Sequence, residues 1–188
     1  ITAPYINYSG NEIDSLNFSM LTNAENFKFD LGFKNIKSGP LDIPRTSFTG
    51  SKKDKFLALN FKASKDEKNL YYVKSDLNFK DKETSFSVKI DSLLLNGEPW
   101  QTAKNNKVIF KEDSVAFSNF IFNRKEQSVR ITDKLQDYSK PHLAFEFENF
   151  KLSEILYYLN PQDRLVEGIL DGNFIIEDPL KDTGIVTK

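Results

Sequence analysis

The sequence predicts an all-β protein whose strands form an antiparallel meander, with about ten to twelve strands along the chain. Three observations support this fold class: apolar and polar residues alternate in many short segments, phenylalanine is unusually frequent, and turn-forming residues separate the segments. Alternation with a period of two places apolar side chains on one face of a strand and polar side chains on the other. One wet and one dry face are typical of antiparallel sheets, because parallel sheets bury both faces.

The composition is that of a folded chain, and it excludes several classes of function. There are 17 phenylalanines against one tryptophan and one methionine, and phenylalanine favours the half-buried surface of a sheet. The 26 basic and 27 acidic residues nearly cancel, so we expect no nucleic-acid partner, since that function depends on basic patches. The chain has no cysteine, which excludes disulfides, thiolate zinc sites and cysteine nucleophiles. No apolar run reaches the roughly 18 residues of a membrane helix.

The alternation is clearest in residues 27–33, where every odd position is apolar and the even positions are charged or glycine. Charged side chains such as Lys74, Asp76 and Lys89 occupy the intervening positions of later segments in the same way. The same pattern predicts further strands around residues 16–20, 57–61, 71–79, 86–90, 108–110, 115–117, 129–131, 143–147 and 166–176.

Turns are expected where glycine, asparagine and proline interrupt the alternation. Glycine and asparagine tolerate the positive φ of tight turns, and proline fixes the first turn position. The spacing from one segment to the next suits a meander of hairpins. The expected turns lie at residues 9–11, 38–40, 49–51, 96–99 and 104–106.

One short helix is expected over residues 153–160. Ser153 can cap its start, and Glu154 lies in the first turn, where a negative charge is favourable. Asn160 and Pro161 end the helix, because the residue before proline is pushed out of helical geometry. The apolar positions follow helical spacing and are Leu152, Ile155, Leu156 and Leu159.

No arrangement of residues typical of catalysis is present, so we expect a non-enzyme that needs no cofactor or metal. His142 is the only histidine, no Gly-x-Ser-x-Gly motif occurs, and there is no glycine-rich phosphate loop. We interpret His142 as a surface or edge residue. The segment 133–137 lacks the glycine and terminal glutamate of a calcium loop. Glu146 and Glu148 share one strand face and are expected to be solvated surface charges.

The apolar face of the strands is the remaining functional candidate, and three arrangements fit it. Two sheets could pack their phenylalanine-rich faces together as a sandwich core, which the periodicity by itself favours. The face could instead line an open groove for acyl chains, since phenylalanine is bulky and needs no hydrogen bond. Strands of an outer-membrane barrel alternate similarly, but the aromatic girdles of such barrels are absent.

The last third of the chain resembles the family of TamB, the translocation and assembly module subunit, and its AsmA-like relatives. The resemblance lies in the strand and short helix of residues 142–156 and in the following Gly168-Ile-Leu-Asp-Gly172-Asn-Phe174, which is similar to the Gly-x-Leu-x-Gly-x-apolar strands of that family. Residues 108–110, 115–120 and 128–131 are similar to its repeating strand pattern.

This resemblance implies a fold and a role. Family members are long periplasmic β-sheets curved into a taco-like groove that is lined by apolar residues. An N-terminal helix, which is not part of this sequence, anchors them in the inner membrane. An outer-membrane barrel partner similar to TamA receives them through parts outside this sequence. They are associated with phospholipid transport between the membranes and with assembly of outer-membrane proteins, and no catalytic residues accompany the family.

On this basis we expect residues 1–188 to be a single segment excised from a longer continuous sheet, forming part of a periplasmic conduit whose partners are phospholipid acyl chains. A structural or chaperone module that pairs its strand edges with client strands is the alternative. Unpaired strand edges could also make the fragment form an artificial dimer. The residues expected to contact acyl chains, called here the groove candidates, are Phe27, Phe29, Leu31, Phe33, Leu57, Leu59, Phe61, Phe86, Val88, Phe145 and Phe147.

Overall fold

The protein is almost entirely antiparallel β-sheet. The computed structural model describes residues 1–23, 26–163 and 165–180. Strands account for 68% of the structure and helix for 2%, and the largest element is an open, curved sheet. The predicted all-β meander with one short helix is therefore confirmed.

The described residues form 17 strands and one helix, more strands than the sequence predicted. Several of the additional strands are short. The elements are β1 (Thr2–Tyr8), β2 (Asn11–Thr22), β3 (Asn26–Phe33), β4 (Asn35–Ser38), β5 (Leu41–Ile43), β6 (Arg45–Lys53), β7 (Phe56–Lys65), β8 (Lys68–Lys80), β9 (Glu83–Leu95), β10 (Glu98–Pro99), β11 (Gln101–Thr102), β12 (Lys107–Phe110), β13 (Val115–Ser118), β14 (Ile121–Arg124), β15 (Gln127–Thr132), β16 (His142–Lys151), α1 (Ser153–Leu156) and β17 (Ile169–Glu177).

Hairpin turns without glycine explain part of this difference. Asp54, Asp66 and Lys125 adopt positive φ angles of 54°, 48° and 53° at three such turns. Aspartate tolerates this conformation because its short polar side chain can bond to the local backbone. The sequence pattern, which relied on glycine, asparagine and proline, did not mark these turns.

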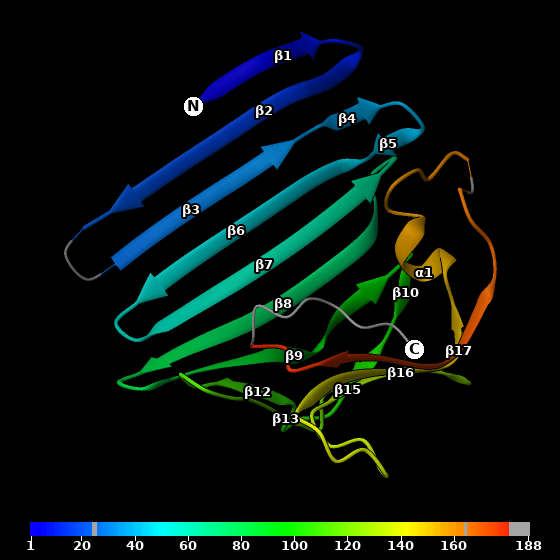
Figure 1. Ribbon diagram of the computed structural model, residues 1–188. Coiled ribbons are helices and arrows are strands. Elements are labelled where there is room, and N and C mark those ends of the chain that lie inside the picture. Colours follow the sequence, from blue (N-terminus) through cyan, green and yellow to red (C-terminus); the bar gives the residue numbers. More distant parts are fainter. Residues whose placement is uncertain (24–25, 164, 181–188) are drawn as a thin grey trace.

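The strands make two sheets. The large sheet has 12 strands, in the order β13-β12-β9-β8-β7-β6-β3-β2-β4-β5, with β1 paired to β2 and β10 paired to β9. The smaller sheet has five strands in the order β11-β14-β15-β16-β17. Figure 1 shows the large sheet as a broad twisted layer, with the smaller sheet at its β9–β12–β13 end.

A line of backbone irregularities crosses the large sheet. Ser15 has a φ of 57° inside β2, Lys34 separates β3 from β4, and Pro44 separates β5 from β6. On the next pair of strands, the register of β7 and β8 shifts between Ala63 and Ser64. Bulges of this kind bend a strand and increase its twist. We call the line through Ser15, Lys34, Pro44 and Ser64 the crease.

One predicted turn, at residues 49–51, is wrong. Residues 49–51 lie in the middle of β6, where Gly50 pairs with Phe29 of β3. The Phe29 ring lies over this glycine, since a Cβ built on Gly50 would fall 2.0 Å from Phe29 Cε1. Gly50 therefore leaves space for an aromatic ring on the neighbouring strand, a contact that stabilises glycines within sheets.

Replacing Gly50 with alanine is expected to lower the free energy of unfolding by about 1–2 kcal/mol, because the Phe29 ring must leave its position. Urea denaturation measures this change. Gly32→Ala in β3 is the matched control, since its Cβ would meet Thr46 O at an ordinary 3.5 Å. Equal stability of the two variants would contradict the contact.

The helix is shorter than predicted. α1 spans Ser153–Leu156, and residues 157–159 continue only as turns. Leu152 is the N-cap and no side chain caps it, so the prediction that Ser153 caps the helix is wrong. Within the described part of the chain, no helix has the length and hydropathy needed to span a bilayer.

The core is small and lies where the two sheets meet. Val88 of β9, Val108 of β12 and Phe120, which precedes β14, form its buried cluster. Phe122 of β14 and Ile131 of β15 pack against this cluster from the smaller sheet. The accessible surface is 12259 Å², about a third more than the roughly 9,200 Å² expected for a compact monomer of this mass. Much of the large sheet is therefore left without a covering layer.

Candidate functional site

Nine of the eleven groove candidates share one face of the large sheet. Leu31 of β3 lies opposite Phe48 of β6, and Phe48 lies opposite Phe61 of β7, so the three side chains point the same way. We call this surface the apolar face and the opposite one the polar face. The register places on the apolar face Phe27, Phe29, Leu31, Phe33, Leu57, Leu59, Phe61, Phe86 and Val88.

The part of the apolar face over β3, β6 and β7 is only partly buried. The ring centroids of Phe27 and Phe29 are 5.5 Å apart, and those of Phe29 and Phe48 are 5.2 Å apart. All three rings are partly buried by one another and by the strands below them. Among the described residues, the core cluster between the sheets does not extend to these rings. This region is an open apolar surface.

Phe86 and Val88 have a different environment. Val88 is 6% exposed within the core cluster, and Phe86 packs on that cluster. The ring of Phe86 lies 6.0 Å from that of Phe120. These two candidates thus stabilise the junction of the sheets, and the sandwich arrangement applies to this end of the apolar face.

The remaining two candidates, Phe145 and Phe147, line an apolar hollow on the smaller sheet. The hollow has a volume of about 530 Å³ and lies over β16 and β17. Gly172 faces Phe147 across the strand pair, and no atom lies within 4 Å of a Cβ built there. The missing side chain helps to create the space. Its other apolar lining residues are Leu170, Phe174 and Ile176.

This hollow lies on the face of the smaller sheet that turns toward the core. Ile131, which packs on the core cluster, pairs with Phe145, and Val129 pairs with both Phe147 and Phe122. Opposite residues of paired strands share a face. The hollow therefore continues the apolar side of the sheet junction toward β17, the outer strand of the described smaller sheet.

The segment after α1 covers one end of the apolar face. The ring of Tyr158 lies 5.8 Å from that of Phe61 and 5.4 Å from that of Tyr71. Its hydroxyl is 3.1 Å from the hydroxyl of Thr46, and burial raises the pKa of Tyr158. The segment after α1 thus packs on the sheet beside Phe61.

A buried polar network holds α1 to the smaller sheet. Glu154 is 3% exposed and accepts hydrogen bonds from Arg124 Nη1 at 3.1 Å and Gln127 Nε2 at 3.3 Å. Arg124 also contacts Glu98 at 2.9 Å. Burial, and then the charge of Glu154, raises the pKa of Tyr71. Sequence reasoning missed this network because its members come from four separate elements.

The residues that were considered for catalysis make hydrogen bonds and ion pairs that stabilise the fold. His142 is buried, contrary to the predicted surface position, because its Nε2 accepts the Leu135 N–H at 2.9 Å and its Nδ1 lies 2.7 Å from the Lys140 carbonyl oxygen. Glu146 pairs with Arg130 at 3.0 Å on the solvated face. In the described ranges, no three histidine, aspartate or glutamate side chains gather as metal ligands.

Two hollows larger than the one on the smaller sheet do not lie on the apolar face. One of about 680 Å³ lies near the crease, and one of about 600 Å³ is lined by charged residues such as Lys28, Asp30 and Lys74. Both open on the polar face of the large sheet. Phe29 and Leu59 also contribute to the lining of the second of these hollows, whereas Phe145 and Phe147 line the hollow on the smaller sheet.

Comparison of the chain with models of known protein families, with curated proteins and with solved structures finds no match.

Proposed function

We propose that this chain is a non-catalytic, lipid-binding segment of a longer periplasmic protein related to the TamB and AsmA-like family. Its apolar surfaces hold phospholipid acyl chains on their way between the inner and outer membranes. Other parts of that protein carry a membrane anchor and make the contact with a separate outer-membrane barrel partner. The observation that carries the proposal is the apolar hollow lined by Phe145 and Phe147, which opens beside β17.

The chemistry of this hollow fits an acyl chain. Its lining is almost wholly apolar, and Phe145, Phe147 and Phe174 contribute aromatic rings without a polar group. Each methylene group removed from water contributes about 0.8 kcal/mol, so a chain can be held without a specific polar contact. The open apolar surface around Phe29 offers a second place where the same chain can lie. Exposed apolar patches are typical of interaction sites, and this supports the proposal.

Lipid carried through purification tests the proposal directly. We expect mass spectrometry of the purified protein to detect phospholipid, and a photoreactive fatty acid to cross-link to peptides of β16 and β17. Delipidated protein should take up a fluorescent fatty acid. A purified protein without lipid that also fails to bind the fluorescent probe would contradict the function.

Replacing Phe147 with aspartate is expected to weaken binding of the fluorescent fatty acid at least tenfold, because a carboxylate in an apolar site must be desolvated. The measurement is a fluorescence titration. Phe56→Asp is the matched control: Phe56 is 41% exposed and lies on the polar face, so binding should be unchanged. If both variants bind as the original protein does, the acyl chain lies elsewhere.

Strand-edge pairing is the second candidate function, and β17 is the observation that favours it. This strand has β16 as its one neighbour in the described sheet, and Ile169 is 62% exposed. An exposed edge can accept a strand from a client protein. Proline substitutions within β17 should then abolish client recruitment while Phe147→Asp preserves it; the lipid proposal expects the Phe147 variant to fail.

A further inference from the structure

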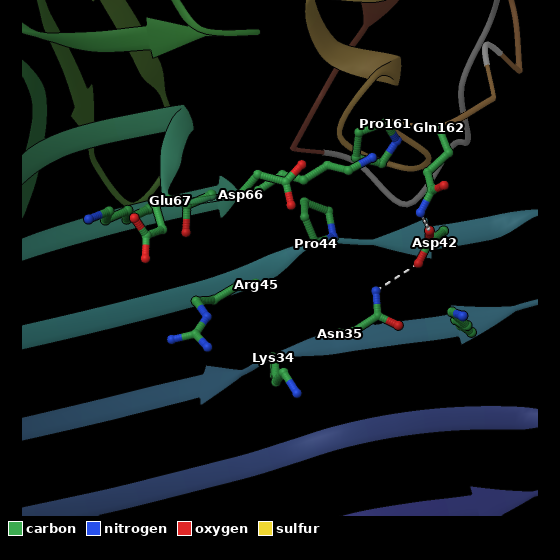
Figure 2. A pocket seen from close by; sticks show the side chains of 13 residues that line it. Lys34, Asn35, Asp42, Pro44, Arg45, Asp66, Glu67, Pro161 and Gln162 are labelled. Atoms are coloured by element: carbon green, nitrogen blue, oxygen red, sulfur yellow. Dashed lines mark hydrogen bonds between the residues drawn. The ribbon is translucent and has the colours of Figure 1, made fainter.

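The hollow of about 680 Å³ near the crease has the composition of a binding site that the lipid proposal does not use. Figure 2 shows its side chains gathered around the ends of β3 and β6 and the hairpin between β7 and β8. Pro44 and Pro161 contribute rigid walls, and both are buried. We call it the crease hollow. Its charged lining residues are Lys34, Lys37, Asp42, Arg45, Lys62, Lys65, Asp66 and Glu67.

The backbone irregularities of the crease create this hollow. Lys34 interrupts the strand between β3 and β4, and its N–H donates to the carbonyl oxygen of Asp14 at 2.8 Å. Lys34 and Asn35 are consecutive, yet both side chains line the same hollow, which regular alternation along a strand does not allow. Bulges re-aim side chains in this way and are frequent beside functional sites.

Arg45 and Lys62 lie next to each other on the polar face. Arg45 pairs with Ser64 of β7, and Ser47 pairs with Lys62, so the two cations stand on neighbouring strands with their positions offset by two residues. Phe48 and Phe61 point to the opposite face in the same strands. The crease hollow is therefore separated by the sheet itself from the apolar surface, and the inference does not depend on the proposed function.

The charges around the crease hollow favour an anion. Five of its lining residues are cationic and three are anionic. The Asp42 carboxylate accepts hydrogen bonds from Asn35 Nδ2 at 2.7 Å and from Gln162 Nε2 at 3.0 Å. Lys34 contacts Asp14 at 3.1 Å.

Four further cations line the hollow, together with Asp66 and Glu67. In the described part of the chain no ion pair engages Lys37, Arg45, Lys62 or Lys65. Hydrogen bonds from Ser15 and Lys34 hold the pKa of the neighbouring Asp14 below its usual range, and the charge of Arg45 makes a smaller contribution in the same direction.

We propose that the crease hollow binds a phosphate-bearing anion, with Arg45 as the bidentate ligand and Lys62 as the adjacent point charge. The guanidinium group matches two phosphate oxygens, while an ammonium group offers a mobile charge. Lys37 and Lys65 add long-range attraction from two sides of the hollow. The phosphate is either free in solution or the headgroup of an anionic lipid, since both present the same oxygens.

Calorimetric titration with inorganic pyrophosphate at low ionic strength tests the site. Arg45→Gln combined with Lys62→Gln should raise the dissociation constant at least tenfold. Both residues are exposed, so the thermal midpoint should stay unchanged. Lys53→Gln combined with Lys82→Gln is the matched control, because it removes the same charge from exposed positions outside the hollow. Arg45→Lys keeps the charge but loses the planar fork, and it should also weaken binding.

Vesicle flotation identifies the source of the phosphate. Binding to vesicles of phosphatidylcholine with phosphatidylglycerol, competed by pyrophosphate and lost in the Arg45/Lys62 variant, assigns the site to a lipid headgroup. Pyrophosphate binding without vesicle binding assigns it to a free ligand. The proposal is overturned if the original protein does not bind pyrophosphate, or if both double variants weaken binding equally, since that result reflects only overall charge.

Discussion

Replacing Glu154 with alanine is expected to lower the free energy of unfolding by about 3–5 kcal/mol, the cost of breaking a buried ion pair by removing one partner. The Glu154 side chain is 4% exposed and that of Arg124 is 13% exposed. Without Glu154, the ion-pair partner that remains for Arg124 among the described residues is Glu98, whose side chain is 51% exposed. Gln127 Nε2 also loses its acceptor. The loss is therefore larger than that of a surface ion pair.

Urea denaturation followed by circular dichroism measures this effect. Glu148→Ala is the matched control, because Glu148 is an exposed glutamate near the end of β16 that accepts one hydrogen bond from Ser128. We expect the control to change stability by about 0.5 kcal/mol or less. If Glu154→Ala and Glu148→Ala cost the same, the buried network does not hold α1 to the smaller sheet.

Replacing Phe120 with alanine is expected to cost about 3–4 kcal/mol, as a large-to-small change in a closed core. Phe120 is 7% exposed. Its ring lies 5.0 Å from that of Phe122 and 5.9 Å from that of Phe117, measured between centroids. Because Phe122 belongs to the smaller sheet and Phe117 to the large one, the truncation weakens the junction between them.

Phe110→Ala is the matched comparison, because it truncates a more exposed phenylalanine. Phe110 lies opposite Val115 of β13 and Thr84 of β9, on the same face as Val108, but it is 42% exposed. We expect its truncation to cost about 1 kcal/mol, since less apolar surface returns to water. Equal costs for Phe110 and Phe120 would mean that the apolar face is covered throughout, which would remove the open surface proposed for lipid.

Much of the apolar face could be predicted from the sequence because alternation is a local property. Phe29 and Val88 both follow the period of two, and the register places both on one face of the large sheet. Their environments nevertheless differ, since Val88 is buried between the sheets and Phe29 lies over Gly50 on the open part. Nothing in the residues around either position distinguishes the two cases.

The features that sequence reasoning missed all depend on partners distant in the chain. His142 was expected at the surface, but the backbone of Leu135 and Lys140 encloses it. Gly50 was read as a turn residue, because its role follows from Phe29 on another strand. Glu154 was expected to favour the first turn of a helix, whereas its main contacts are Arg124 and Gln127. No local sequence pattern predicts such contacts.

The sequence by itself determined the strand character of the chain and which side chains share a face, because a period of two acts within a few residues. The tertiary structure alone decided which part of that face is closed. The smaller sheet docks at the β9, β12 and β13 end and leaves β3, β6 and β7 open. The crease and the hollow over Gly172 likewise arise from strand pairing between distant segments. Burial depends on what packs against a strand, and that is set by long-range docking.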